Sequence, residues 1–172
     1  NTRIVKEHIY PLEQLVQLRH AFSQRKFAEE AARVVPTTER IHAEITEAGL
    51  RLAAIGELDL EGAVETLQKK YGKKLTVGKP AIRYVSESVL QEPYMIVEVM
   101  TPANFVGSVA GDLHNRKALI TEMKDSADMK LVRVEVPLSM MFGYSTTLRT
   151  LTEARGSFTM HFLEYRPAQP VD

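Results

Sequence analysis

The sequence predicts an α+β protein made of two ferredoxin-like split βαββαβ domains in tandem. Two segments with a period of two residues, at 40–54 and 118–137, indicate hairpins. Each hairpin is preceded by a strand and a helix pattern and followed by a helix and a strand pattern. This order is that of a split βαβ unit, and it occurs twice. We expect the boundary near residues 86–91, with domains over 1–87 and 88–172.

The opening strand and helix have the weakest patterns. Residues 3–9 are a candidate strand, and Pro11 opens a stretch of good helix formers that runs to Val35 and is closed by Pro36. Leucine and valine supply the apolar side of this stretch, at Leu12, Leu15, Val16 and Leu18. We expect one long helix or two consecutive helices over these residues.

The rest of the first half has clearer periodicity. Residues 40–54 alternate between apolar and polar on both sides of a turn at 47–49, which predicts a hairpin. Residues 57–71 place apolar side chains three and four apart, with acids in the first turn and lysines in the last, as the helix dipole prefers. We therefore expect an amphipathic helix there and a closing strand within 75–84.

The second half repeats this order with different residues. The expected elements are a strand at 94–100, a helix after Thr101-Pro102, a hairpin of strands at 118–123 and 130–137, a helix through Leu148 and Leu151 that ends at Gly156, and a strand at 157–165. In the last strand, Phe158, Met160 and Phe162 should face the core.

Composition narrows the classes of function. The chain has 172 residues, with 22 basic and 22 acidic side chains and no cysteine. A formal charge of zero excludes overall basicity as a means of binding nucleic acid, so any RNA contact must be a local patch. The absence of cysteine excludes disulfides and thiolate chemistry. Apolar stretches are far shorter than the roughly 20 residues of a membrane span, and a cytoplasmic location is expected.

Motifs for catalysis and metal binding are absent from the sequence. The phosphate-binding loop GxxxxGK[ST] does not occur, so we expect no nucleotide hydrolysis and no cofactor in this chain. The histidines are isolated from one another, and we expect no metal site. Glu57, Asp59 and Glu61 are a dense acidic cluster that could bind a cation, but they occupy the start of a predicted helix, where the dipole favours them.

Two groups of motifs resemble elongation factor G, a translational GTPase. GELDLE at 56–61 and VGKP at 77–80 resemble its third domain, with Asp59 where that family usually has histidine. From about Gln91 to Tyr165 the chain resembles its fifth domain, through LQEPYMIVEVMTP, GDLHNRKALI, VEVPLSMMFGYSTTLRTLTEARGSF and MHFLEY. The resemblance covers about residues 49–167.

This resemblance implies a module that engages the ribosome and couples the state of a GTPase domain to contact with ribosomal RNA during translocation. Residues 1–87 would be like domain III and residues 88–172 like domain V. The implied partners are ribosomal RNA, ribosomal proteins and the GTPase domain of the parent factor, where GTP and Mg²⁺ would bind. The fourth domain of the family does not occur between Tyr84 and Gln91: either the protein naturally lacks it, or the segment was excised.

Residues of the domain-V-like half are candidates for contact with ribosomal RNA. They are Arg149, Thr152, Arg155, Arg116 and Lys117. Arg149 and Thr152 are three apart on a predicted helix and share a face, so a guanidinium and a hydroxyl would reach one stretch of backbone. The alternative is that Arg149 pairs with Glu153 at i,i+4 and only solvates the helix.

Two further functions are compatible with the fold. A tandem of ferredoxin-like domains also serves to sense small ligands or to bind other proteins, because fold does not determine function. Sedimentation with purified ribosomes separates these alternatives from the first hypothesis.

Overall fold

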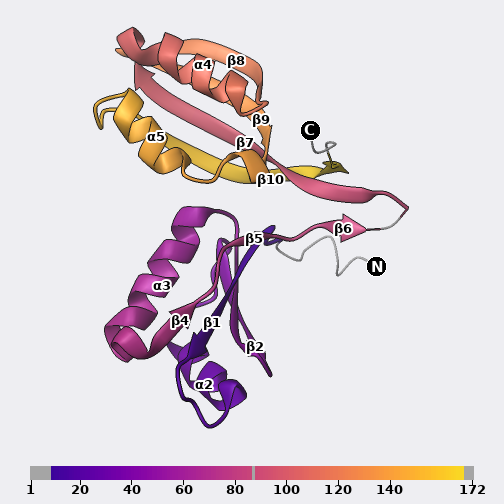
Figure 1. Ribbon diagram of the computed structural model, residues 1–172. Helices are drawn as coiled ribbons and strands as arrows, with labels where there is room; N and C mark the ends of the chain where they lie inside the picture. Colours follow the sequence, from indigo (N-terminus) through magenta and orange to yellow (C-terminus); the bar gives the residue numbers. More distant parts are fainter. Residues whose placement is uncertain (1–8, 87, 169–172) are drawn as a thin grey trace. The chain divides into compact units, whose positions relative to one another are not determined.

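The chain forms two compact units that divide between Arg83 and Tyr84, here called unit 1 and unit 2. The structure is a computed structural model that describes residues 9–86 and 88–168. Each unit has one antiparallel sheet with two α-helices, so the α+β class and the tandem ferredoxin-like architecture are confirmed (Figure 1). None of the helices in the described ranges is long and apolar enough to cross a membrane.

Unit 1 has the strand order of a split βαβ unit. Its elements are β1 (Leu12–Leu18), α2 (Gln24–Ala31), β2 (Ile41–Thr46), β3 (Gly49–Ala54), α3 (Glu57–Tyr71), β4 (Leu75–Val77) and β5 (Ala81–Ile82). Short 3₁₀ turns follow α2 and α3, at Ala32–Val34 and Gly72–Lys74. The sheet order is β2-β3-β1-β4, with β5 also paired to β1. The first strand therefore lies between the third and the fourth, as this topology requires.

The expected helix from Pro11 was wrong over its first part, which is strand β1. Leu12, Gln14 and Val16 occupy alternate positions of this strand and share its buried face. The side-chain amide of Gln14 donates from Nε2 to the carbonyl of Gly78 at 2.7 Å. A polar residue on the buried face disguised the period of two. The candidate strand at 3–9 lies almost entirely outside the described residues.

The hairpin and the second helix of unit 1 are as the sequence predicted. β2 and β3 pair around the turn before Gly49, and α3 spans Glu57–Tyr71. The carboxylate of Asp59 accepts a hydrogen bond from the backbone N–H of Gly56 at 3.1 Å, which caps the helix. Apolar side chains from both helices and from the strands form one core, which includes Leu12, Val16, Phe27, Ala28, Leu50, Leu52, Leu60 and Leu67. Each large side chain buried there stabilises the unit by about 1.5–3 kcal/mol.

Unit 2 repeats the topology with longer strands. Its elements are β6 (Val85–Ser86), β7 (Leu90–Pro102), α4 (Val106–Asn115), β8 (Leu119–Ser126), β9 (Met129–Pro137), α5 (Tyr144–Leu151) and β10 (Ser157–Pro167). The sheet order is β10-β7-β9-β8. Val132, Val134 and Val136 of β9 are fully buried beneath the helices, so strict alternation predicted this strand correctly.

Two boundaries in unit 2 differ from expectation. The segment at 86–91 has no sequence pattern, yet Val85 and Ser86 pair with Gln91 and Leu90 in a hairpin that belongs to unit 2. Helix α5 ends at Leu151 and not at Gly156, because the chain then turns with positive φ at Glu153 and Ala154. The sequence has no apolar signal for either feature.

We predict that residues 84–172 fold alone, because unit 2 contains a complete sheet and its own core. This fragment should melt cooperatively and give a circular dichroism spectrum with both helix and strand. A matched fragment over 88–172 lacks the pairing of β6 and should be less stable by about 1 kcal/mol in urea titrations. A fragment over 84–172 that melts without a cooperative transition would contradict the division into units.

Candidate functional site

The candidate RNA contacts of unit 2 do not form a single cluster. Arg116 ends α4, and its Nη2 donates to the hydroxyl of Thr147 in the first half of α5 at 3.1 Å. Arg155 follows α5, and its guanidinium lies 5.9 Å from the ring centroid of Phe105, just before α4 begins. The two arginines therefore lie toward opposite ends of the helical layer.

Arg116 has a structural role that the sequence did not indicate. Its Nε pairs with Asp112 at 2.9 Å, and its Nη1 donates to the carbonyls of Met140 and Phe142 at 2.8 and 3.2 Å. The side chain is only 16% exposed. The guanidinium thus fixes the end of α4 to the segment before α5. The i,i+4 spacing of Arg116 from Asp112 was the only sequence signal of this role, and contact of Arg116 with RNA stays a prediction.

Tyr144 completes the structural cluster around Arg116. Its ring lies 5.0 Å from the Arg116 guanidinium and meets Phe158 edge to face at 5.1 Å. The side chain is buried, and its hydroxyl has no hydrogen-bond partner within the described part of the chain. Burial raises the pKa of this hydroxyl, the charge of Asp112 raises it further, and Arg116 opposes the shift.

Thr152 is not on an exposed face with Arg149, so that expectation was wrong. It is fully buried. Its hydroxyl donates to the carbonyl of Leu148 at 2.7 Å and accepts from the N–H of Gly156 at 2.8 Å. A Cβ at Gly156 would lie 2.9 Å from the Thr152 side chain, so glycine is needed for this close approach. Thr152 terminates the helix and is unavailable to a ligand.

Arg149 and Arg155 are both exposed near the C-terminal end of α5. The N–H of Ala154 donates to the carbonyl of Arg149 at 2.7 Å, so the turn brings the backbone before Arg155 back beside the helix. Because Glu153 lies in this turn and not on the helix, the alternative pairing of Arg149 with it does not form, and Arg149 has no ion pair within residues 9–86 and 88–168. Two exposed guanidiniums are suited to phosphate contact.

Lys117 is exposed directly after Arg116, in a backbone conformation with φ of 63°. It therefore projects from the opposite end of the helical layer from Arg155, next to the Arg116 cluster. Of the five candidates, Arg149, Arg155 and Lys117 are placed where a large partner could reach them.

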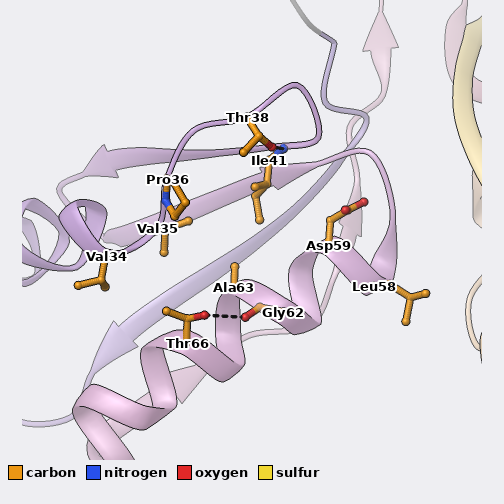
Figure 2. Close-up of a pocket in the computed structure, with 10 residues that line it drawn as sticks. All are labelled: Val34, Val35, Pro36, Thr38, Ile41, Leu58, Asp59, Gly62, Ala63 and Thr66. Atoms are coloured by element: carbon orange, nitrogen blue, oxygen red, sulfur yellow. Dashed lines mark hydrogen bonds between the residues drawn. The ribbon is translucent and has the colours of Figure 1, made fainter.

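Unit 1 has a groove of about 320 Å³ between the loop before β2 and helix α3. Figure 2 shows Val35 and Pro36 on the loop, Ile41 at the start of β2, and Ala63 and Thr66 on the helix. Its remaining lining residues are Val34, Thr38, Leu58, Asp59 and Gly62. These walls are mostly apolar and carry one charged group.

That charged group, Asp59, is engaged by the protein itself. Both of its carboxylate oxygens accept hydrogen bonds from Arg40, at 3.1–3.3 Å, and one also caps α3. Asp59 therefore forms a local ion pair at the position where the resembled family usually has histidine. In the described residues, no group of three or more histidine, aspartate and glutamate side chains is placed to hold a metal ion.

Comparison with known proteins matches unit 2 to a translation factor domain. Residues 89–172 match the family described as elongation factor G C-terminus. A crystal structure of a protein from Thermus thermophilus is similar to the whole chain, with a TM-score of 0.63 and 18% sequence identity. The alignment covers 95% of this chain and 42% of that protein, so the chain spans less than half the length of this relative. At this identity the likeness shows the fold.

We predict that Arg116→Ala lowers the free energy of unfolding by about 2–4 kcal/mol, because it leaves Asp112 without its partner and two carbonyls without donors. Arg149→Ala is the matched control. It removes an exposed arginine from the neighbouring helix and should change stability by no more than about 0.5 kcal/mol. Urea denaturation of both variants provides the comparison, and equal effects would contradict the structural role of Arg116.

We predict that Tyr144→Phe raises the free energy of unfolding by about 1 kcal/mol, because it removes a buried hydroxyl that has no partner. The folded-state pKa of Tyr144 is above its unfolded value, so the wild type loses stability as pH rises through about 10, while the variant does not undergo this loss. The advantage of the variant should therefore widen between about pH 8 and about pH 10.5 in urea titrations. A constant or shrinking difference would contradict the burial of this group.

Proposed function

We propose that the chain is the ribosome-engaging C-terminal module of an elongation-factor-G-like translation factor, on the premise that residues 89–172 match the family described as elongation factor G C-terminus. The observation that carries the proposal is that the matched segment contains all but the short β6 of a complete ferredoxin-like unit. In this proposal unit 2 contacts ribosomal RNA, while unit 1 relays the state of a GTPase domain that lies outside this sequence.

The contact with RNA is proposed to be electrostatic and local. The chain has no net charge, so its affinity for a polyanion depends on where exposed cations are placed. Arg149 and Arg155 present guanidinium donors near the end of α5, and Lys117 presents an ammonium group after α4. Guanidinium groups form paired hydrogen bonds with phosphate oxygens, which would fix the orientation of unit 2 on the RNA backbone.

The proposed relay role would use the contacts that join Arg83 to the sheet of unit 1. The N–H of Arg83 donates to the carbonyl of Pro11 at 2.8 Å, and its guanidinium contacts Glu13 and Glu44 at 2.9 and 2.7 Å. The last residue of unit 1 is thus tied to two strands of its own sheet. In this proposal, a displacement of the sheet of unit 1 moves Arg83 with it, and Arg83 is the residue directly before Tyr84. GTP hydrolysis, with its Mg²⁺, belongs in this proposal to the parent's GTPase domain.

We predict that the double variant Arg149→Glu/Arg155→Glu weakens binding to purified ribosomes by at least about 10-fold in sedimentation assays. Loss of two phosphate contacts should lower the slope of log affinity against log salt by about two. The melting temperature should change little, because exposed charges contribute about 0–1 kcal/mol each.

The control is Arg33→Glu/Lys79→Glu, which changes the net charge equally at two exposed positions of unit 1. Its affinity and salt slope should stay near those of the wild type. If both double variants lose affinity alike, the effect is one of total charge, and the assignment of the end of α5 as the RNA-facing surface is overturned.

A further inference from the structure

Unit 1 contains two stretches of chain without acidic residues, which the proposed function does not use. Residues 14–28 and 66–86 contain no aspartate or glutamate, although the whole chain has as many acidic as basic side chains. The first stretch includes the loop between β1 and α2, and the second includes the turn between α3 and β4.

The fold brings these two stretches together at one end of unit 1 (Figure 1). The N–H of Arg19 donates to the carbonyl of Lys74 at 2.7 Å, which joins the loop after β1 to the turn after α3. A second contact holds the helices, since the rings of Phe27 and Tyr71 meet edge to face at 5.1 Å. Arg19, His20 and Lys26 of the first stretch therefore lie at the same end of unit 1 as Lys73 and Lys74 of the second.

Several of these cations have no acidic partner. Arg19, His20, Lys26, Lys73 and Lys74 are exposed, and none of them has an ion pair within the described ranges. Acids next to the surface are already engaged: Glu30 accepts from the hydroxyl of Tyr71 at 2.9 Å and pairs with Lys70 at 3.2 Å. Lys26 also lies in the first turn of α2, where the helix dipole disfavours a cation, so its position brings no benefit to the helix.

Phe22 lies between Arg19 and Lys26 in the loop that joins β1 to α2, and it is fully exposed. Its loop is held in place from both sides. The Gln24 side chain accepts from the N–H of Leu18 at 3.0 Å and donates to its carbonyl at 2.8 Å, and the Ser23 hydroxyl caps α2. The ring is therefore not part of the core, and it is exposed on a loop that hydrogen bonds hold on both sides.

We infer that Phe22 and the cations Arg19, Lys26, Lys73 and Lys74 form a docking site for single-stranded RNA, with a base stacked on the ring and phosphates on the cations. Aromatic rings on a positively charged surface bind unpaired bases by stacking, whatever the base. A protein partner would need several apolar residues at the centre of its contact, whereas here a single ring is surrounded by charge. The inference goes beyond the proposed function, because it concerns the other unit.

The absence of tryptophan provides a direct test of this site. In the full chain, Phe22→Trp introduces a single fluorophore, and an oligoadenylate of about 12 nucleotides should quench it as a base stacks on the indole. Leu58→Trp is the matched reporter, since it is half-exposed in the same unit but lies beside Glu57 and Asp59. Its quenching should be weak at the same RNA concentration.

Two further variants separate stacking from charge. Phe22→Ala should weaken oligoadenylate binding by about 10-fold, the effect of losing one stacked base. Lys73→Glu/Lys74→Glu should lower the salt slope by about 0.7 for each lysine. Equal quenching of both reporters, unchanged affinity of Phe22→Ala in a protein with a normal melting curve, or equally strong binding of polyglutamate would each overturn the RNA site. Polyglutamate binding would point to an acidic protein instead.

This test is independent of the surface proposed for unit 2. Oligoadenylate quenching of the Phe22→Trp reporter should persist when Arg149→Glu/Arg155→Glu is added. If the quenching is lost in that combination, the reporter senses binding to unit 2, and the site at Phe22 is overturned. If ribosome binding fails to respond to the arginine variants while the quenching persists, only the proposed function of unit 2 fails.

Discussion

Each unit covers only one face of its sheet with helices, and this constraint determines most of what the residues do. On the covered face, leucine, valine and methionine fill the core. On the open face, charged residues pair across the sheet: Arg83 contacts Glu13 of β1 and Glu44 of β2, and Arg166 of β10 contacts Glu135 of β9 at 2.7 Å. Such pairs are partly solvated and contribute little stability individually. They connect elements across the open face, while the buried face supplies most of the stability.

The same constraint explains which elements the sequence predicted. In β3 and β9, apolar residues alternate with polar ones and lie on the face that the helices cover, so pattern and structure agree. Helix α3 was predicted to the residue because its apolar spacing, its acids and its lysines all indicate one helix. Strand β1 failed because Gln14 occupies the covered face and is satisfied by Gly78, a residue 64 positions away. Local pattern cannot contain that information. The end of α5 was missed for a similar reason, since Thr152 turns its hydroxyl back onto the helix.

Charge in the sequence did not distinguish structural arginines from exposed ones. The sequence predicts both Arg116 and Arg149 as helical cations, but two carbonyls that accept from Arg116 come from a segment more than 20 residues later. The sequence therefore did not indicate which of the candidate residues are exposed and which are engaged within unit 2. The missing information was tertiary: which carbonyls face a guanidinium, and whether a hydroxyl is already bonded. Of the predicted set, Arg149, Arg155 and Lys117 are exposed, whereas Arg116 and Thr152 form hydrogen bonds within unit 2.

A formal charge of zero is a weak guide to the partners of this chain, because the charges are segregated along α3. This helix has 15 residues, so it is about 22 Å long. Glu57, Asp59 and Glu61 lie at its start, and Lys69, Lys70, Lys73 and Lys74 lie in its last turn and just beyond, as the dipole favours at both ends. At physiological ionic strength the Debye length is about 8 Å, so a polyanion at the basic end is screened from the acids at the other. A partner interacts with the local surface, whereas the net charge averages the acidic start and the basic end of α3.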